Sequence, residues 1–498
     1  MNLSSLISTN ALAKPDRTAV ICGDTGRKYS WAKLDEYVNK LGTALKSLGI
    51  EQGEMVAIYL PNSPEFLLTY FALNRIGAVT VPFNILFKTR EIAHIINDSK
   101  ARVLIGSADE VESYVLADRD RFARLEKIIT VGRPLTGTID FQTLLSYPCQ
   151  VLEPAACSPD DIVSLMYTSG TTGEPKGAML SFGNLLKIGI LSSQLLTIND
   201  QDLMLTGAPF CHIFFVLTVL GPFNMGAGLI TMKRFNPEKA LELISAYRAT
   251  HFAGVPTMYI YMLDKYESGK YDLTSWRFAQ SAGASLPVET FMRIRDKFGV
   301  QLCEGYGATE TSSTITYNRL GHSKAGSVGP VAAGVQAKVV DDWGNQLRTR
   351  EIGEVLVKGP GVFKGYWQMP EATAKVLQGE WYWTGDLGWF DEEGYLYIVD
   401  RKKDMIVCCG YNVYPLEVEK VIYQHSKVLE AVVVGIKDPV RNQIPKAFVR
   451  LRNGVEMTSE EMIDFCAQQL ASYKVPRAVE FVRELPKSPT GKILRRAL

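Results

Sequence analysis

The hydrophobic positions over about the first 325 residues alternate between helical and strand spacing. Residues 31–48 carry apolar side chains three or four positions apart and end at Gly49, which is typical of a helix and its C-terminus. The apolar run 55–60 predicts a strand, and Ser63 followed by proline predicts the start of the next helix. Repeated strand–helix–strand units predict doubly wound α/β layers over about residues 1–325.

The pattern changes after residue 325 to short strands separated by turns. Runs rich in Asp, Asn, Glu and Gly at 341–345 and 391–394 predict hairpin turns. Residues 326–400 are therefore expected to form a small β-rich subdomain.

Beyond residue 400 a third pattern begins. An apolar run at 431–435 predicts a strand, and Thr458 with Glu461 forms a capping box that predicts a helix. We expect residues 401–498 to form a small α+β lid domain, and residues 1–400 to form the large N-terminal domain.

One segment, residues 203–232, carries no acidic or basic side chain and is long enough to cross a bilayer. Prolines, glycines and a histidine interrupt it, so it predicts a buried strand–helix–strand passage and no transmembrane segment. The N-terminus has no basic head followed by an apolar core, so no secretory signal is expected. Peripheral membrane contact and the oligomeric state are left open by the sequence.

Charge and cysteine usage narrow the function classes. The 498-residue chain has 54 basic and 53 acidic residues, so no overall field attracts nucleic acid. None of the eight cysteines forms a metal-type Cys-x-x-Cys pair, and the adjacent Cys408 and Cys409 suit a disulfide poorly. A reduced, cytoplasmic protein is predicted.

The most distinctive polar segment follows the apolar run 162–166 and reads Tyr-Thr-Ser-Gly-Thr-Thr-Gly-Glu-Pro-Lys-Gly at residues 167–177. Glycines let N–H groups converge, hydroxyls add donors and the lysine adds a mobile charge, which favours polyphosphate binding. An exposed turn is the alternative on composition alone, and the segment does not match a Walker A loop. The predicted phosphate contacts are Thr168, Ser169, Gly170, Thr171, Thr172, Gly173 and Lys176.

Further candidate parts follow along the chain. The run 305–310 contains the aromatic ring of Tyr306, the hydroxyl of Thr309 and the carboxylate of Glu310, whose oxygens suit Mg²⁺. On its own, this run is equally typical of a tight turn around a core tyrosine. Asp386 can accept hydrogen bonds from both ribose hydroxyls or cap a turn. Lys492 lies in a basic segment that resembles an ordinary disordered end.

Together and in this order, these segments resemble the acyl-adenylate-forming superfamily, in its acyl-CoA synthetase or fatty-acid–CoA ligase branch. The resemblance spans essentially the whole chain and implies an ATP-dependent acid–CoA ligase that uses Mg²⁺ and coenzyme A. It implies Glu310 as the Mg²⁺ ligand and Lys492 as the catalytic lysine that bridges carboxylate and nucleotide. Beyond the phosphate loop, the implied ATP contacts are Gly283, Ala284, Glu304, Gly305, Tyr306, Thr309, Asp386 and Arg401.

The resemblance also implies a second half-reaction in which the lid rotates about Lys403 and a lid loop meets coenzyme A at Cys409 and Gly410. The pair Cys408-Cys409 departs from the residues usual there, which puts the contact of residue 409 in doubt. An enzyme that passes its acyl group to a carrier protein is the alternative.

The acyl group is expected near residues 209–215, where the family places a histidine that matches His212. A buried core histidine is the alternative for His212. Phe214 and Phe215 are the further acyl-pocket candidates, followed by apolar residues 216–223. A medium- or long-chain fatty acid is predicted, with an aryl acid as the close rival.

Overall fold

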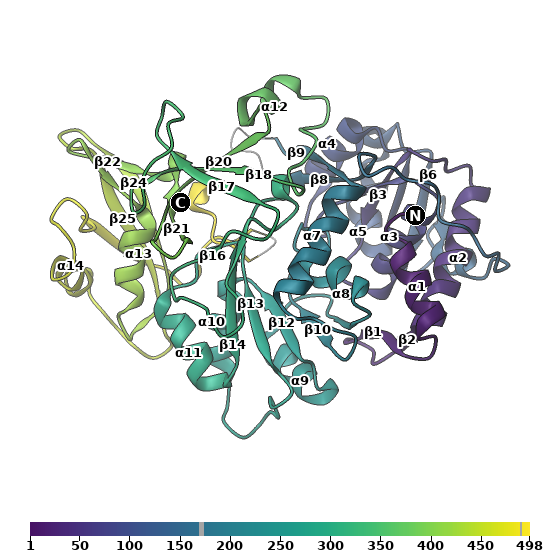
Figure 1. Ribbon diagram of the computed structural model, residues 1–498, viewed down its shortest axis with the longest axis horizontal. Coiled ribbons are helices and arrows are strands. Elements are labelled where there is room, and N and C mark those ends of the chain that lie inside the picture. The colour runs from purple at the N-terminus through teal and green to yellow at the C-terminus, as the bar shows by residue number, and fades with distance from the viewer. Residues whose placement is uncertain (169–173, 489–490) are drawn as a thin grey trace.

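We describe the protein from a computed structural model, in which residues 1–168, 174–488 and 491–498 are placed (Figure 1). The predicted α/β class is confirmed, with a large N-terminal part and a smaller C-terminal unit. In Figure 1 the N-terminal part fills the right and centre, and the C-terminal unit lies at the left.

The first large sheet has the spatial order β7-β6-β5-β3-β4-β8-β9. All neighbouring strands are parallel except β8 and β9. The strands are β3 (Met55–Tyr59), β4 (Val79–Pro82), β5 (Val103–Ser107), β6 (Lys127–Val131), β7 (Ile139–Asp140), β8 (Ile162–Thr168) and β9 (Lys176–Ser181).

The second large sheet has the order β15-β14-β13-β12-β10-β11-β1-β2, with antiparallel pairs only at its two edges. The strands are β1 (Thr18–Cys22), β2 (Lys28–Ser30), β10 (Leu203–Thr206), β11 (Gly228–Thr231), β12 (His251–Gly254), β13 (Phe278–Ser281), β14 (Gln301–Tyr306) and β15 (Thr316–Tyr317).

Helices connect the strands of these sheets, and their starts follow the predicted signals. Ser63 accepts a hydrogen bond from Phe66 N at the start of the second predicted helix, and Gly49 follows the first. The helices are α1 (Ser5–Ala13), α2 (Trp31–Ser47), α3 (Pro64–Arg75), α4 (Thr89–Ser99), α5 (Ala108–Tyr114), η1 (Leu116–Phe122), α6 (Phe141–Leu145), α7 (Phe182–Leu195), η2 (Val216–Leu220), α8 (Gly221–Asn224), α9 (Pro237–Tyr247), α10 (Pro256–Lys265), α11 (Val288–Phe298) and η3 (Thr309–Thr311).

The two large sheets share one hydrophobic core. It contains Ile58 from the first sheet and Leu229 from the second. Between them Trp31 packs edge to face on Phe223, with ring centroids 4.9 Å apart. The apolar segment 203–232 forms β10, η2, α8 and β11 inside this core, as predicted. Among the described residues, no helix combines the length and the hydropathy needed to cross a membrane.

A smaller antiparallel sheet follows, with the order β16-β21-β20-β18-β17 and β19 paired to β20. The predicted turn 391–394 connects β20 to β21. The elements are β16 (Gly329–Pro330), β17 (Gln336–Val340), β18 (Gly353–Lys358), α12 (Pro370–Val376), β19 (Leu377–Gln378), β20 (Trp381–Phe390) and β21 (Tyr395–Arg401).

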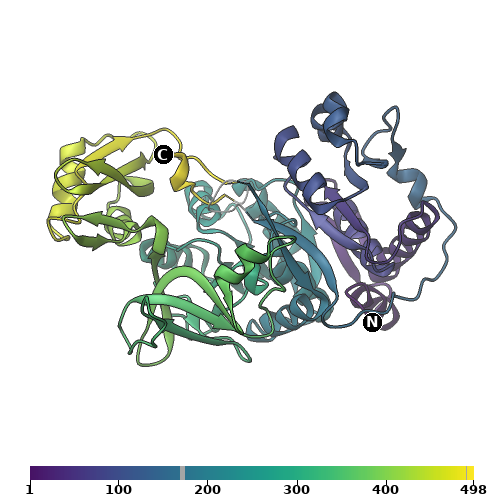
Figure 2. The ribbon, with the colours of Figure 1, turned by 90° about the horizontal axis from the view of Figure 1, so that it is seen from above.

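The C-terminal unit has its own sheet and its own small core around Val418, Val433 and Met462. The domain boundary at 400/401 stays a prediction; β21 ends at Arg401, and the next strand belongs to the C-terminal sheet. The elements are η4 (Lys402–Asp404), β22 (Ile406–Cys408), β23 (Tyr411–Val413), α13 (Pro415–Tyr423), β24 (Val428–Asp438), β25 (Asn442–Leu451), α14 (Ser459–Ala467), β26 (Ala478–Phe481) and η5 (Arg495–Ala497). Figure 2 shows the yellow C-terminal segment running from this unit back toward the N-terminal part.

Candidate active site

Several of the predicted nucleotide contacts lie at the carboxyl ends of strands in the two large sheets. β8 ends at Thr168, β14 ends at Tyr306, and Gly283 and Ala284 follow β13. Ligands of open α/β sheets bind outside these strand ends. The fold therefore brings together residues that are far apart in the sequence.

The predicted phosphate loop is described only at its flanks. Ser169, Gly170, Thr171, Thr172 and Gly173 lie outside the described residues. On either side, Thr168 ends β8 and Lys176 begins β9, and the two are register partners. A strand begins at Lys176, in agreement with the mismatch to a Walker A loop.

Tyr306, Asp386 and Arg401 form a connected group. The Tyr306 hydroxyl donates to Asp386 Oδ2 at 2.6 Å, and Arg401 Nε lies 3.5 Å from Asp386 Oδ1. Asp386 and Arg401 are register partners on β20 and β21. Burial raises the pKa of the Tyr306 phenol well above its ordinary value, so its hydroxyl keeps the proton it donates. These contacts fix the orientation of the Asp386 carboxylate; its contact with the ribose hydroxyls stays a prediction.

Tyr366 connects the predicted phosphate-binding lysine to the predicted metal ligand. Its ring centroid lies 5.3 Å from Lys176 Nζ, and its hydroxyl donates to Glu310 Oε1 at 2.7 Å. The following residue, Trp367, donates its N–H to Gly177 O at 2.8 Å, which holds this segment beside β9. Sequence reasoning missed Tyr366, because no spacing rule relates residue 366 to residues 176 and 310.

Glu310 fits a magnesium ligand. Burial raises the pKa of its carboxyl group, while the hydrogen bond from Tyr366 opposes that shift. A divalent cation would compensate the desolvated negative charge. Mg²⁺ takes one or two protein carboxylates and completes its shell with phosphate oxygens and water. In the part of the chain that the structure describes, no group of three or more His, Cys, Asp or Glu side chains is placed to hold a metal ion.

Lys492 reaches the same region from the C-terminal segment. Burial and the charge of Arg401 lower the pKa of Lys492 to about 8, while Asp386 opposes the shift. The lysine charge in turn adds to burial in lowering the pKa of His212 to about 4, so His212 is neutral near pH 7. The lid lysine thus lies within electrostatic reach of the predicted ribose pair and of the predicted acyl-site histidine.

The segment after Lys492 is held by a buried ion cluster. Arg495 donates to Asp400 Oδ1 at 2.8 Å and to both carboxylate oxygens of Glu419 at 2.8 and 2.9 Å. Both acceptors are buried. Because Asp400 lies on β21, this contact connects the C-terminal segment to the strand that carries Arg401. Sequence reasoning did not single out Arg495.

The acyl-pocket candidates have different surroundings. Phe214 donates its N–H to His212 Nδ1 at 3.3 Å, and its side chain is buried. Phe215 packs in the core, with ring centroids 4.7 Å from Tyr70 and 5.9 Å from Phe66. The structure therefore places His212 near Lys492 and turns the ring of Phe215 toward the core aromatics.

Glu304 and Gly305 have partners within the protein. Glu304 Oε1 accepts from Leu286 N at 3.0 Å, and burial raises the pKa of Glu304 to about 8. At Gly305 a Cβ atom would lie 2.4 Å from the ring of Tyr317, so only glycine fits there. Thr309 begins η3 beside Glu310. Nucleotide contacts of Glu304 and Gly305 stay predictions.

The predicted coenzyme A contacts lie on the C-terminal unit. Cys409 and Gly410 form the two-residue turn between β22 and β23, with φ of +52° and +82°. Two left-handed residues are typical of a type I′ hairpin turn. In Figure 1 β22 lies at the outer edge of this unit, away from the C-terminus. Lys403, the predicted hinge, lies in η4, which connects β21 of the small antiparallel sheet to β22 of the C-terminal sheet.

All eight cysteines are free, so no disulfide forms. Cys149 and Cys409 are exposed, whereas Cys408 is buried beside its neighbour.

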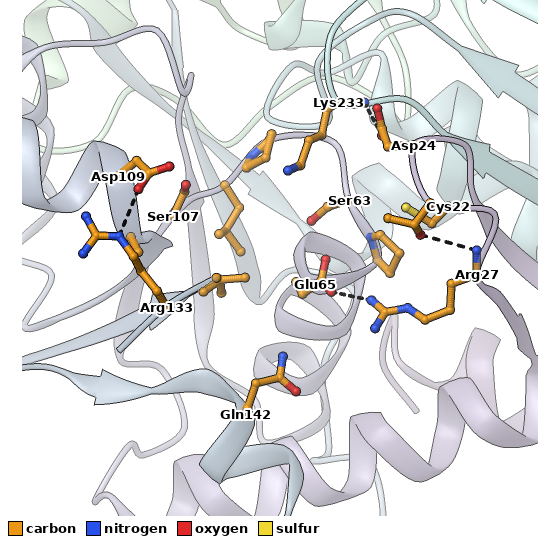
Figure 3. Close-up of a pocket in the computed structure, with 17 residues that line it drawn as sticks. Cys22, Asp24, Arg27, Ser63, Glu65, Ser107, Asp109, Arg133, Gln142 and Lys233 are labelled. Carbon is orange, nitrogen blue, oxygen red and sulfur yellow. Dashed lines mark hydrogen bonds and ion pairs between the residues drawn. The ribbon is translucent and has the colours of Figure 1, made fainter. Parts of the chain in front are cut away.

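A separate cavity of about 410 Å³ lies at the carboxyl ends of β3, β5 and β6 (Figure 3). None of the predicted site residues lines it. Two of its cations are paired, since Arg27 lies 2.7 Å from Glu65 and Arg133 lies 3.2 Å from Asp109. The cavity is therefore distinct from the candidate site.

Comparison with known proteins identifies the family. The AMP-binding enzyme model matches residues 7–367, and the AMP-binding enzyme C-terminal domain model matches residues 417–492. The chain belongs to the AMP-binding enzyme family. It is similar to the long-chain-fatty-acid–CoA ligase of Bacillus subtilis (strain 168), with 35% identity over 100% of this chain and 94% of the relative.

Solved structures of this family agree in fold. An anthranilate CoA ligase in complex with anthranoyl-AMP has a TM-score of 0.94 and 31% identity, over 100% of this chain and 96% of that one. The o-succinylbenzoate coenzyme A synthetase of Bacillus subtilis, in complex with ATP and magnesium ion, has a TM-score of 0.85 and 29% identity, over 99% and 98%. The family member described here is an acyl-CoA ligase that uses ATP, Mg²⁺ and coenzyme A.

Proposed function

We propose that this ligase first joins a carboxylate to the α-phosphate of ATP, releasing pyrophosphate, and then transfers the acyl group to the thiol of coenzyme A, releasing AMP. The observation that carries the proposal is the position of Lys492, half-buried and within electrostatic reach of Arg401, Asp386 and His212. A compact cation there offsets the charge that develops as two anions react.

The other roles follow from the same geometry. Asp386 and Arg401 hold the ribose, Lys176 holds the phosphates that leave, and Glu310 binds Mg²⁺. Lys403 is the hinge about which the lid turns, and Cys409 and Gly410 then meet coenzyme A. The outer position of β22 in Figure 1 supports a turn of the lid between the two half-reactions.

For the acid, we propose a medium- or long-chain fatty acid. The neutral imidazole of His212 and the buried, apolar Ile213 and Phe214 suit an uncharged acyl group. An aryl acid is the second candidate, because the aromatic ring of Phe214 suits a flat substrate equally well. We also propose a cytoplasmic location, which the eight free cysteines support.

A panel of carboxylates tests the substrate class. Coenzyme A-dependent AMP release should be faster with an alkanoate of medium or long chain than with benzoate or cinnamate. If benzoate or cinnamate gives faster AMP release than every alkanoate, an aryl acid replaces the fatty acid as the proposed substrate. AMP formation without any thioester would instead favour transfer to a carrier protein.

The pKa of Lys492 predicts a pH dependence. Lys492 is cationic below its pKa of about 8, so kcat/KM for ATP–pyrophosphate exchange should fall above pH 8, approaching tenfold per pH unit. Lys492→Arg should keep a lower but flat profile over this range, because a guanidinium does not lose its proton there. If the arginine variant shows the same fall, another group is responsible for it.

A further inference from the structure

Helix α10 carries two side chains that bind the lid segment next to Lys492. Thr257 Oγ1 donates to Gly491 O, the residue before Lys492, at 2.9 Å. One helical turn later, the Tyr261 hydroxyl meets the Lys487 ammonium at 2.6 Å. Residues four apart lie on the same face of a helix, so one face of α10 contacts this loop at two points.

All hydrogen-bonding positions of the Tyr261 hydroxyl are occupied at this contact. It donates to Glu430 Oε2 at 3.0 Å and accepts from Arg450 at 3.1 Å as well as from Lys487. A phenol has one donor and two acceptor positions, so all three are satisfied. The three partners belong to the C-terminal unit, whereas Tyr261 belongs to the N-terminal part.

The ion pairs of Glu430 are made within the C-terminal unit and do not include Tyr261. The side chain of Glu430 is fully buried and lies 3.0 Å from Arg450 and 3.0 Å from Lys487. Both cations move with the lid, so separation from α10 leaves no unpaired charge. The contact between Tyr261 and the lid therefore fixes one position of the lid and can break without leaving a charge unpaired, as a rotating lid requires.

Gly491 also fits closely against α10. A Cβ at this position would lie 3.3 Å from Thr257 Oγ1 and 3.3 Å from Val255 Cγ2, and its φ is +86°. The backbone at Gly491, next to Lys492, thus packs against the first turn of α10.

We propose that Thr257 and Tyr261 are positioning residues that hold Lys492 in the adenylation orientation and so set the balance between the two half-reactions. The inference rests on the proposed role of Lys492. Neither residue touches the reacting atoms; each acts through the lid segment. Weakening the contact should slow adenylation and leave thioester formation unimpaired.

The test uses Tyr261→Phe and Thr257→Val, which remove one hydroxyl each and keep nearly the same shape. Each variant should lower ATP–pyrophosphate exchange by roughly fivefold, and the double variant by more. Thioester formation from supplied acyl-AMP and coenzyme A should be unchanged or faster. Thr257→Ser should restore exchange, because the serine hydroxyl can reach the same carbonyl.

Tyr271→Phe is the matched control, because the Tyr271 hydroxyl is buried and has no hydrogen-bond partner among the described residues. It should leave both half-reactions unchanged. Equal loss of both half-reactions in Tyr261→Phe, or wild-type rates in the double variant, would overturn the inference. Lys492→Ala, assayed in parallel, distinguishes failure of this inference from failure of the proposed function. If Lys492→Ala keeps ATP–pyrophosphate exchange, the proposed role of Lys492 is wrong. If Lys492→Ala loses exchange while the double variant keeps it, only the positioning role of Thr257 and Tyr261 is wrong.

Discussion

The Lys492→Ala variant should lose ATP–pyrophosphate exchange by roughly 10²- to 10³-fold, as expected when one group that stabilises transition-state charge is removed. Thioester formation from supplied acyl-AMP should be largely retained, because the proposed rotation of the lid moves Lys492 away from the nucleotide before that step. Single-turnover assays of each half-reaction measure the two rates separately.

A lysine elsewhere on the lid provides the control for this variant. Lys446 pairs with Glu480 at 2.7 Å on the lid, so Lys446→Ala removes a similar charge without reaching the site. Its exchange rate should match that of the wild type. Equal loss of both half-reactions in Lys492→Ala would contradict the assignment of this lysine to adenylation alone.

The Lys403→Pro variant should show the opposite selectivity. Proline fixes φ, so the connection between β21 and β22 can no longer rotate freely. Thioester formation should fall by at least roughly tenfold more than adenylation, as expected when a hinge is impaired. Both rates are measured with the assays used for Lys492→Ala.

Lys403→Ala is the matched control, because it removes the same side chain and leaves φ free. Its rates should lie close to those of the wild type in both half-reactions. A proline variant with an unaffected overall rate would exclude residue 403 as the hinge.

Much of the fold follows from local signals in the sequence. Ser63 and Thr458 cap the helices that they were predicted to start, because an N-cap side chain acts on N–H groups only two or three residues away. The uncharged segment 203–232 is a buried strand–helix–strand passage, as its prolines and glycines predict. These features depend on neighbours along the chain, so the chain order reveals them.

The site could be predicted only in part, for the same reason. Glu310 and Asp386 stand out because they lie in compact motifs. Tyr366 and Tyr261 do not, since each acts through a residue more than fifty positions away. The conformation of the lid is also invisible in the sequence, because it depends on contacts between separate domains.

The distribution of cysteines makes the proposed rotation directly measurable. Cys149 in the N-terminal part and Cys409 at the tip of a lid hairpin are exposed. Burial raises the pKa of Cys157 to about 11 and that of Cys211 to about 12, which suppresses their thiolates, and the other four are buried. Spin labels should therefore attach preferentially at 149 and 409. Pulsed dipolar spectroscopy on this pair would report the distance between the two domains before and after acyl-adenylate formation, without an engineered cysteine.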